Sequence, residues 1–442
     1  MPEKNALISQ AKAVLAKNWT GEFTKPTANL YPHQWNWDAG FIAIGYAHYD
    51  MDRAEAELRA LFRGQWRNGM LPHIIFREER SAQYFPGASF WRTHLAVEAP
   101  ADLRTSGITQ PPVQGFALWH IYQTATDKDR ALNLVKELYP KILRMHQYLY
   151  AFRDPEQEGL ACIRHPWESG TDNSPTWDGP MARTDLSRVQ LPAYERADNK
   201  IGQAEHRPTQ RDYDYYVYLL DIYRRYNYNE VSIHAHCPFR IQDPLFNSML
   251  QRSNECMAEL APLIGESPMV WQDWAIHTRE AMNHKLWDAE RGTYNAFDLV
   301  AGEVIRIETS SGFMPLFAGI PSEAQAQKMI YRLSGPAFSG TTENPAYLCP
   351  TLNLQDPRLD FRKYWRGPIW INMNWLLWHG LRRYGYDTLA RRVKEEAMSL
   401  IRQHGFFEYF HPLKKAEGEI ALGAADFSWS AALYIDWELG GD

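Results

Sequence analysis

The spacing of apolar residues constrains the fold of this 442-residue chain more than any other feature of its sequence. In residues 51–66, apolar side chains recur at every third or fourth position, as one buried side of a helix requires. Asp52 and Glu55 have the spacing of a capping box at the start of this helix. The same periodicity predicts further helices over residues 4–18, 112–125, 129–151, 213–226, 247–263, 269–287, 321–333, 370–384, 387–403 and 428–438. Few segments read as strands, so we predict an all-α fold of about a dozen helices.

Long segments between the predicted helices carry many of the aromatic residues, which make up 14% of the chain. These segments are residues 25–41, 66–94, 161–212 and 335–368. Long loops in a compact domain are often functional. A helical scaffold with aromatic loops at one end therefore favours an α/α barrel with a pocket at its mouth. Because no Gly/Ser-rich or Pro-rich linker divides the sequence, we predict one domain over residues 1–442, with cap insertions around 66–94 and 161–245.

Charge and motif content argue against several classes of protein. The chain has 47 basic and 53 acidic residues, which argues against nucleic-acid binding. It shows no signal-peptide pattern and no apolar run of about 20 residues, so we expect a cytoplasmic protein without membrane contact. Dinucleotide-binding, P-loop, nucleophile-elbow and HExxH motifs are absent from the sequence.

A metal site has only weak support in the sequence. His234, His236 and Cys237 resemble metal ligands, but a solvated loop is the better interpretation, because alternate residues on a loop rarely converge without a fourth ligand. We predict no metal and no cofactor. The number of subunits stays open, and a homo-oligomer is compatible with the sequence.

Four segments do not read as ordinary core. They are residues 31–38, 167–178, 364–370 and 405–410, and each mixes large aromatic residues with carboxylates, amides or arginine. Sugar binding needs this mixture, because the C–H bonds of a pyranose lie on aromatic rings while its hydroxyls need polar partners. Glycoside hydrolysis needs two carboxyl groups, of which one stays protonated and the other is ionised. The second and fourth segments each supply a candidate.

Each candidate also has a structural explanation. The acids of residues 167–178 could cap a helix, and Glu408 could be a buried acid paired with an arginine. Asp38 could anchor a loop, and Trp365 and Trp370 could belong to the core. The presence of all four segments in one chain favours the sugar site.

Taken together, the segments LYPHQWNWDAGF, QWRNGMLPHIIF, SGITQPP, WESGTDNS, YWRGPIW and FFEYF resemble glycoside hydrolase family 63, most closely its bacterial branch of glucosylglycerate and mannosylglycerate hydrolases. The matches run from about residue 30 to about residue 437, which is nearly the whole chain. The resemblance implies an (α/α)6 barrel and an inverting mechanism without a cofactor. It places the general acid on Asp172 and the general base on Glu408, with their carboxyl groups roughly 6.5–9.5 Å apart.

The resemblance also implies the substrate contacts. The hexose would meet Tyr31, Trp35, Trp37, Asp38, Trp167, Gly170, Trp365 and Trp370. The glycerate end would meet Tyr84, Gln110, Arg207, Tyr213 and Tyr364. A guanidinium suits a substrate carboxylate, although residue type alone favours a surface position for Arg207. Asp426-Phe427 departs from the branch, which often has a glutamine beside the Ser-Trp pair, so we expect an altered sugar or water contact near the base.

We therefore expect an inverting α-glycosidase that cleaves 2-O-α-glucosylglycerate to hexose and glycerate, with the mannosyl analogue open as a second substrate. One alternative is an α-glucosidase of the same family that acts on a neutral disaccharide or oligosaccharide. A second is a sugar epimerase that moves protons through a histidine such as His73 or His379. A third is a sugar-binding protein without catalysis, which would not need both Asp172 and Glu408.

Overall fold

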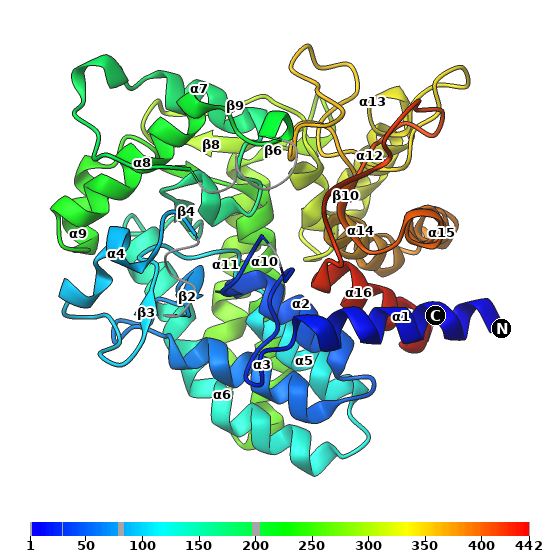
Figure 1. The fold of residues 1–442 in the computed structure, drawn as a ribbon, viewed down its shortest axis with the longest axis horizontal. Helices are drawn as coiled ribbons and strands as arrows, with labels where there is room; N and C mark the ends of the chain where they lie inside the picture. Colours follow the sequence, from blue (N-terminus) through cyan, green and yellow to red (C-terminus); the bar gives the residue numbers. More distant parts are fainter. Residues whose placement is uncertain (1, 29, 78–83, 197–203, 442) are drawn as a thin grey trace.

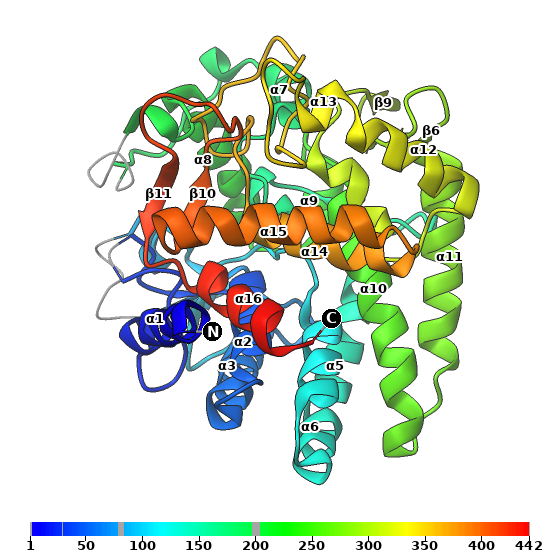
Figure 2. The same cartoon turned by 90° about the vertical axis from the view of Figure 1, so that its right-hand side faces the viewer.

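The computed structural model describes residues 2–28, 30–77, 84–196 and 204–441. Helices dominate these residues, as predicted (Figures 1 and 2). The long helices are α1 (Pro2–Asn18), α2 (Asn36–Tyr46), α3 (Met51–Arg63), α5 (Gln114–Thr124), α6 (Lys128–Tyr148), α8 (Gln210–Arg225), α10 (Pro244–Leu260), α11 (Met269–Lys285), α12 (Glu323–Ser334), α14 (Ile371–Arg383), α15 (Asp387–His404) and α16 (Ser428–Leu439). Shorter helical turns include α4 (Ala88–Trp91), α7 (Asp178–Ala182), α9 (Glu230–His236), α13 (Pro336–Ser339), η4 (Pro166–Ser169), η5 (Pro175–Trp177) and η10 (Ser310–Leu316).

Helical segments far apart in the sequence contact one another in a closed ring. In ring order they are α2, α5, α10, η10, α14 and α16, and α16 contacts α2 again. A second helix packs outside each segment: α3 on α2, α6 on α5, α11 on α10, α12 on η10, α15 on α14 and α1 on α16. An ion pair of 2.6 Å between Lys4 and Glu438 joins α1 to α16, so the two ends of the chain lie close together (Figure 1).

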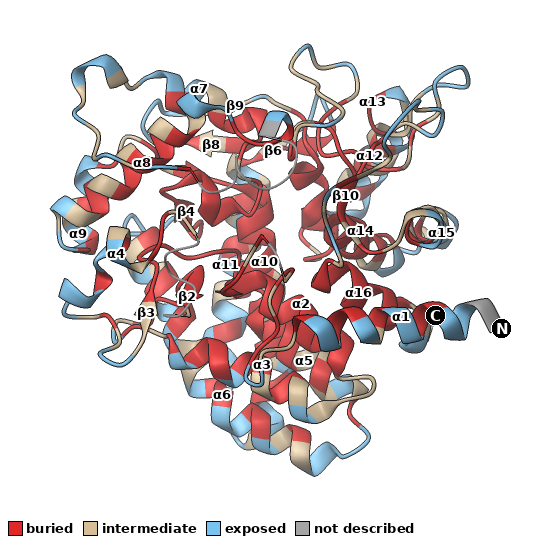
Figure 3. Ribbon diagram, in the orientation of Figure 1, coloured by how far each residue is buried: buried red, intermediate tan, exposed pale blue. Residues whose placement is uncertain are grey.

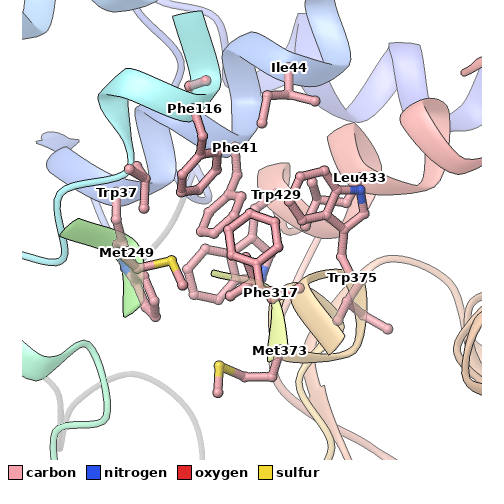
Figure 4. Close-up of a cluster of buried hydrophobic side chains, with 14 of the residues drawn as sticks. Trp37, Phe41, Ile44, Phe116, Met249, Phe317, Met373, Trp375, Trp429 and Leu433 are labelled. Carbon is pink, nitrogen blue, oxygen red and sulfur yellow. The ribbon is translucent and has the colours of Figure 1, made fainter. Parts of the chain in front are cut away.

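The ring segments meet in a cluster of buried apolar side chains (Figure 4). The labelled members are Trp37, Phe41 and Ile44 from α2, Phe116 from α5, Met249 from α10, Phe317 directly after η10, Met373 and Trp375 from α14, and Trp429 and Leu433 from α16. The ring centroids of Phe116 and Phe317 are 5.1 Å apart, and the two rings meet edge to face. Burying one such large side chain contributes about 1.5–3 kcal/mol, so this cluster holds the six ring segments together.

The prediction that residues 25–41 form a loop is wrong for residues 36–41, which begin α2. Every residue of α2 is buried. A helix covered on all sides has no polar stripe, and its sequence therefore shows no amphipathic period. Figure 3 shows the contrast, with buried ring helices at the centre and outer helices such as α15 exposed on their outer sides.

Two smaller predictions also need correction. The carboxylate that caps α3 belongs to Asp50, which accepts a hydrogen bond from the Arg53 N–H at 3.2 Å, and not to Asp52. His234 and His236 lie on the short helix α9, and Cys237 follows it directly, so these three residues do not form a loop.

The strands are short, and in the described residues they form small antiparallel sheets beside the helices. Their order is β1-β2-β3, β4-β5-β8-β9, β6-β7 and β10-β11. The strands are β1 (Gln34–Trp35), β2 (Ile74–Phe76), β3 (Arg104–Thr105), β4 (Cys162–Ile163), β5 (Ile241–Gln242), β6 (Trp287–Asp288), β7 (Thr293–Tyr294), β8 (Ala296–Asp298), β9 (Glu303–Ile305), β10 (Phe407–Phe410) and β11 (Ala421–Ala425). A search of the described helices for one long and apolar enough to cross a bilayer finds none.

Candidate active site

Every residue that the sequence analysis assigned to a site lines one pocket, whose empty volume is about 950 Å³. From the first part of the chain come Tyr31, Trp35, Trp37, Asp38, Tyr84 and Gln110. The central part supplies Trp167, Gly170, Asp172, Arg207 and Tyr213, and the last part supplies Tyr364, Trp365, Trp370 and Glu408. The fold therefore brings the four unusual segments of the sequence together.

Two stacked tryptophans form one wall of the pocket. The rings of Trp365 and Trp370 are 3.9 Å apart and almost parallel, and both residues are buried. The backbone N–H of Trp365 donates to Oδ1 of Asn173 at 2.9 Å, which ties this wall to the segment that carries Asp172. These tryptophans serve the core and the pocket at once, so the two explanations considered for them are compatible.

The three carboxylates of residues 167–178 have different environments. Glu168 is fully buried and forms two hydrogen bonds of 2.8 Å with the Arg153 guanidinium. Asp178 forms an ion pair with Arg366. Asp172 is half-buried, and among the described residues no side chain donates a hydrogen bond to its carboxyl group. Two of the acids are thus structural, and Asp172 faces the pocket.

Burial, with a smaller contribution from the negative charge of Glu408, raises the pKa of Asp172 to about 7, although the Arg207 guanidinium opposes the shift. Burial also raises the pKa of Asp38 well above its usual range, with smaller contributions from Glu408 and Asp172. A carboxyl group with a pKa near 7 can hold a proton at neutral pH and donate it.

The carboxylate of Glu408, unlike that of Asp172, accepts several hydrogen bonds. It lies on β10 and is buried, and four donors surround its carboxylate. Oε1 accepts from the hydroxyls of Tyr31 at 2.8 Å and Tyr364 at 3.2 Å. Oε2 accepts from the Arg207 guanidinium at 3.3 Å and from the backbone N–H of Ala424 at 3.0 Å. These contacts suit an ionised carboxylate, which is the form that can take a proton from water.

Arg207 is buried, so its interpretation as a surface arginine is wrong. Its guanidinium donates to the Tyr31 hydroxyl at 2.9 Å and to Glu408, and it lies 5.0 Å from the centre of the Tyr364 ring. Within the described residues, Glu408 is the one carboxylate that contacts this guanidinium, at an N–O distance of 3.3 Å. A second anion that enters the pocket would therefore find a buried, oriented partner.

Glycine is required at position 170 because the backbone is left-handed there and the chain passes very close to Trp37. The φ angle of Gly170 is +74°, and a Cβ atom would lie 2.6 Å from the indole ring of Trp37. Gln110 holds the backbone of the same residue, since its Oε1 accepts the backbone N–H of Trp37 at 3.2 Å. Both residues therefore set the position of an aromatic surface.

The pocket also contains residues that the sequence analysis did not assign to it: Pro26, Leu30, His73, Phe85, Pro208, Phe427 and Trp429. Phe85 and Pro208 could have been found as neighbours of Tyr84 and Arg207, whereas Pro26 and Leu30 carry no signal. Phe427, part of the departure from the family pattern, presents an apolar ring to the pocket. His73 lines the pocket and His379 does not, so the two histidines do not form a pair there. A search of the described residues for three or more grouped metal-ligand side chains finds none.

Aromatic walls, one carboxyl group that can be protonated and one carboxylate held by four donors together define a glycoside hydrolase. Comparisons with known proteins agree. Residues 31–430 match the model of the mannosylglycerate hydrolase MGH1-like glycoside hydrolase domain. Mannosylglycerate hydrolase from Rubrobacter radiotolerans is 44% identical over 100% of this chain and 98% of its own length. Glucosylglycerate hydrolase from Mycolicibacterium hassiacum is 34% identical over 98% and 97%.

Solved structures give the same result. The family 63 mannosylglycerate hydrolase from Thermus thermophilus, crystallised with Tris and D-glycerate, superposes with a TM-score of 0.89 at 42% identity and covers 98% of this chain and 99% of its own. The same enzyme with glucose gives a TM-score of 0.87. The chain belongs to glycoside hydrolase family 63.

Proposed function

We propose that this enzyme is an inverting α-glycosidase that hydrolyses 2-O-α-glucosylglycerate, and also its mannosyl analogue, to hexose and glycerate. The observation that carries the proposal is the contrast between Asp172 and Glu408 in one pocket. The names of the relatives support the substrate class, since they include both mannosylglycerate and glucosylglycerate hydrolases.

In this proposal Asp172 protonates the glycosidic oxygen, and Glu408 removes a proton from the attacking water. Inversion requires the water to attack the anomeric carbon from the face opposite the leaving group, with the two carboxyl groups roughly 6.5–9.5 Å apart. The hexose would stack on the tryptophans of the pocket and be held by Asp38. Its remaining contacts would come from Tyr31, Trp35, Trp37, Trp167, Gly170, Trp365 and Trp370.

Arg207 supports a glycerate aglycone. A buried guanidinium with a single carboxylate neighbour among the described residues suits a substrate that brings a carboxylate of its own. A neutral disaccharide has no carboxylate that could pair with this guanidinium. Tyr84, Gln110, Tyr213 and Tyr364 would complete the aglycone end. The Thermus enzyme, crystallised with D-glycerate, is consistent with this assignment.

We further propose that residues 1–442 form one catalytic domain, an (α/α)6 barrel with caps around 66–94 and 161–245. The closed ring of helical segments, each with an outer helix, supports the barrel. Both caps contribute to the pocket, the first through Tyr84 and the second through Asp172 and Arg207.

An NMR time course with glucosylglycerate, mannosylglycerate and a neutral α-glucoside tests the proposal. We expect the two glycerate substrates to be cleaved and the first-formed hexose to be the β-anomer. Turnover of the neutral glucoside alone would replace this proposal with the neutral α-glucosidase, and conversion of hexose without release of glycerate would replace it with the epimerase. The Arg207→Ala variant serves as the matched control, because it should lose the preference for glycerate substrates.

A further inference from the structure

His73 is a pocket residue to which the mechanism above gives no role. It precedes β2 and is 3% exposed, yet it lines the same pocket as Asp172 and Glu408. Its ring lies parallel to the indole of Trp167, with centroids 6.1 Å apart and planes inclined by 20°. The backbone is fixed on both sides, since the His73 N–H donates to Ile108 and the His73 carbonyl accepts from Asn36. The imidazole is therefore held in one orientation.

The hydrogen bonds around Ser106 determine which ring nitrogen carries the proton. The Ser106 hydroxyl oxygen accepts the N–H of Ile74 at 3.0 Å and lies 2.9 Å from Nδ1 of His73. Within the described residues, Nδ1 is the acceptor available to the Ser106 hydroxyl proton. If Nδ1 instead carried a hydrogen, that hydroxyl proton would be left without a partner in a buried site, which is costly. The satisfied arrangement has Ser106 donating to Nδ1 and the imidazole hydrogen on Nε2.

Nε2 is then a directed donor toward the pocket. It makes no hydrogen bond within the described residues, and it is not among their buried atoms that lack a partner. Burial and the neighbouring His165 lower the pKa of His73 well below its usual range, so the ring is neutral and cannot act as a cation. A neutral N–H donor beside a tryptophan face suits a sugar. The oxygen of one hydroxyl can accept the hydrogen bond while the neighbouring C–H bonds lie on the indole ring.

We propose that His73 donates a hydrogen bond from Nε2 to one hydroxyl oxygen of the bound hexose, and that Ser106 is a positioning residue that fixes the required tautomer. This inference rests on the proposed function for the identity of the sugar. It gives His73 a binding role that needs no proton transfer to the substrate, whereas the epimerase alternative requires such a transfer.

Deoxy substrates test the contact with His73→Phe, which keeps a ring beside Trp167 but has no donor. We expect kcat/KM on the complete substrate to fall about 10- to 100-fold, as for a lost buried hydrogen bond. One monodeoxy substrate should be the exception: the variant and the wild type should hydrolyse it at nearly equal rates, because its missing hydroxyl has already removed the contact. Equal losses on every deoxy substrate would overturn the proposal. Thermal unfolding and circular dichroism check that the variant is folded.

Ser106→Ala supplies the matched test of positioning. We expect a smaller loss, about 3- to 10-fold, concentrated on the same hydroxyl as in His73→Phe. Two-bond ¹H–¹⁵N NMR should show Nε2 protonated and Nδ1 unprotonated in the wild type, with His73 assigned by its absence from His73→Phe. A proton on Nδ1 would overturn the assignment.

The same comparison separates this inference from the proposed function. If the wild type does not cleave glycosylglycerates, the proposed substrate is wrong, and calorimetric binding of glucose and its monodeoxy derivatives then tests His73. Weaker glucose binding by His73→Phe, with no further loss for one deoxy sugar, would support the contact. Absence of hexose binding, or equal binding by both proteins, would overturn it.

Discussion

Asp172 and Glu408 are two acids in one pocket, and they differ in burial and in the hydrogen bonds that their carboxyl groups accept. Asp172 is half-buried on a loop, receives no side-chain hydrogen bond within the described residues, and has its pKa raised to about 7. Glu408 is buried on a strand and accepts from two tyrosines, an arginine and a backbone N–H. These surroundings, rather than the residue types, support the proposed roles of Asp172 as acid and Glu408 as base.

Removal of the proposed base, Glu408, should have the largest effect. Glu408→Gln keeps the shape of the side chain but cannot accept a proton from water, so we expect kcat/KM to fall about 10⁴-fold. Steady-state kinetics on glucosylglycerate measures the loss. Glu168→Gln is the structural control: it breaks the ion pair with Arg153 and should lower the unfolding temperature as well as activity. Full activity of Glu408→Gln would remove Glu408 from the chemistry.

Removal of the aglycone cation should have the next largest effect. We expect Arg207→Ala to reduce kcat/KM on glycosylglycerates about 100-fold, because a charge-assisted contact with the substrate carboxylate is lost. The loss on an α-glucoside with a neutral aglycone should be smaller, since only the contacts with Glu408 and the Tyr31 hydroxyl disappear. Equal losses on both substrates would show that Arg207 serves the base alone.

The pH dependence sharpens the difference between the acids. Because Asp172 must be protonated to act as the proposed acid, we expect kcat/KM to fall about tenfold per pH unit above a pKa near 7. A raised folded-state pKa also means that Asp172 contributes stability below its ordinary pKa, which is lost as the pH rises toward and through 7. Asp172→Asn should therefore unfold at a higher temperature than the wild type at pH 8, with the gap narrower at pH 5 and closed only below about pH 4. A gap that is independent of pH would contradict the raised pKa.

Single donors around Glu408 should matter least. Tyr364→Phe removes one of the four hydrogen bonds and leaves the aromatic ring in place, so we expect about a tenfold loss of kcat/KM. Tyr409→Phe is the matched control, because the Tyr409 hydroxyl has no hydrogen-bond partner within the described residues. An effect of Tyr364→Phe no larger than that of Tyr409→Phe would mean that this hydroxyl does not support the base.

The sequence predicted the outer helices well because one side of each faces water. It missed α2 because helix neighbours and the ring interior cover all of its residues, and a fully buried helix has no amphipathic period. It also missed η10, whose short 3-10 turns give no 3.6-residue repeat. Burial does not hide every helix, however, since the sequence predicted α16, in which residues 428–437 are all buried.

The site could be predicted as a set of segments rich in aromatic residues and acids, but the roles within it could not. Residue types alone do not separate Asp172 from Glu168 or Asp178, and only the resemblance pointed to Asp172. The separation depends on Arg153, which pairs with the nearby Glu168, and on Arg366, which approaches Asp178 from a distant part of the chain. His73 was named only for the epimerase alternative, because its place in the pocket depends on the pairing of β2, which the sequence does not show.

The division of labour between Asp172 and Glu408 is tested most directly with α-glucosyl fluoride, whose leaving group needs no protonation. We predict that Asp172→Asn retains most of its turnover of this substrate while it loses activity on glucosylglycerate. Glu408→Gln should lose both activities, because each reaction needs an activated water. The reverse pattern, with Glu408→Gln active on the fluoride and Asp172→Asn inactive, would contradict the assignment of acid and base.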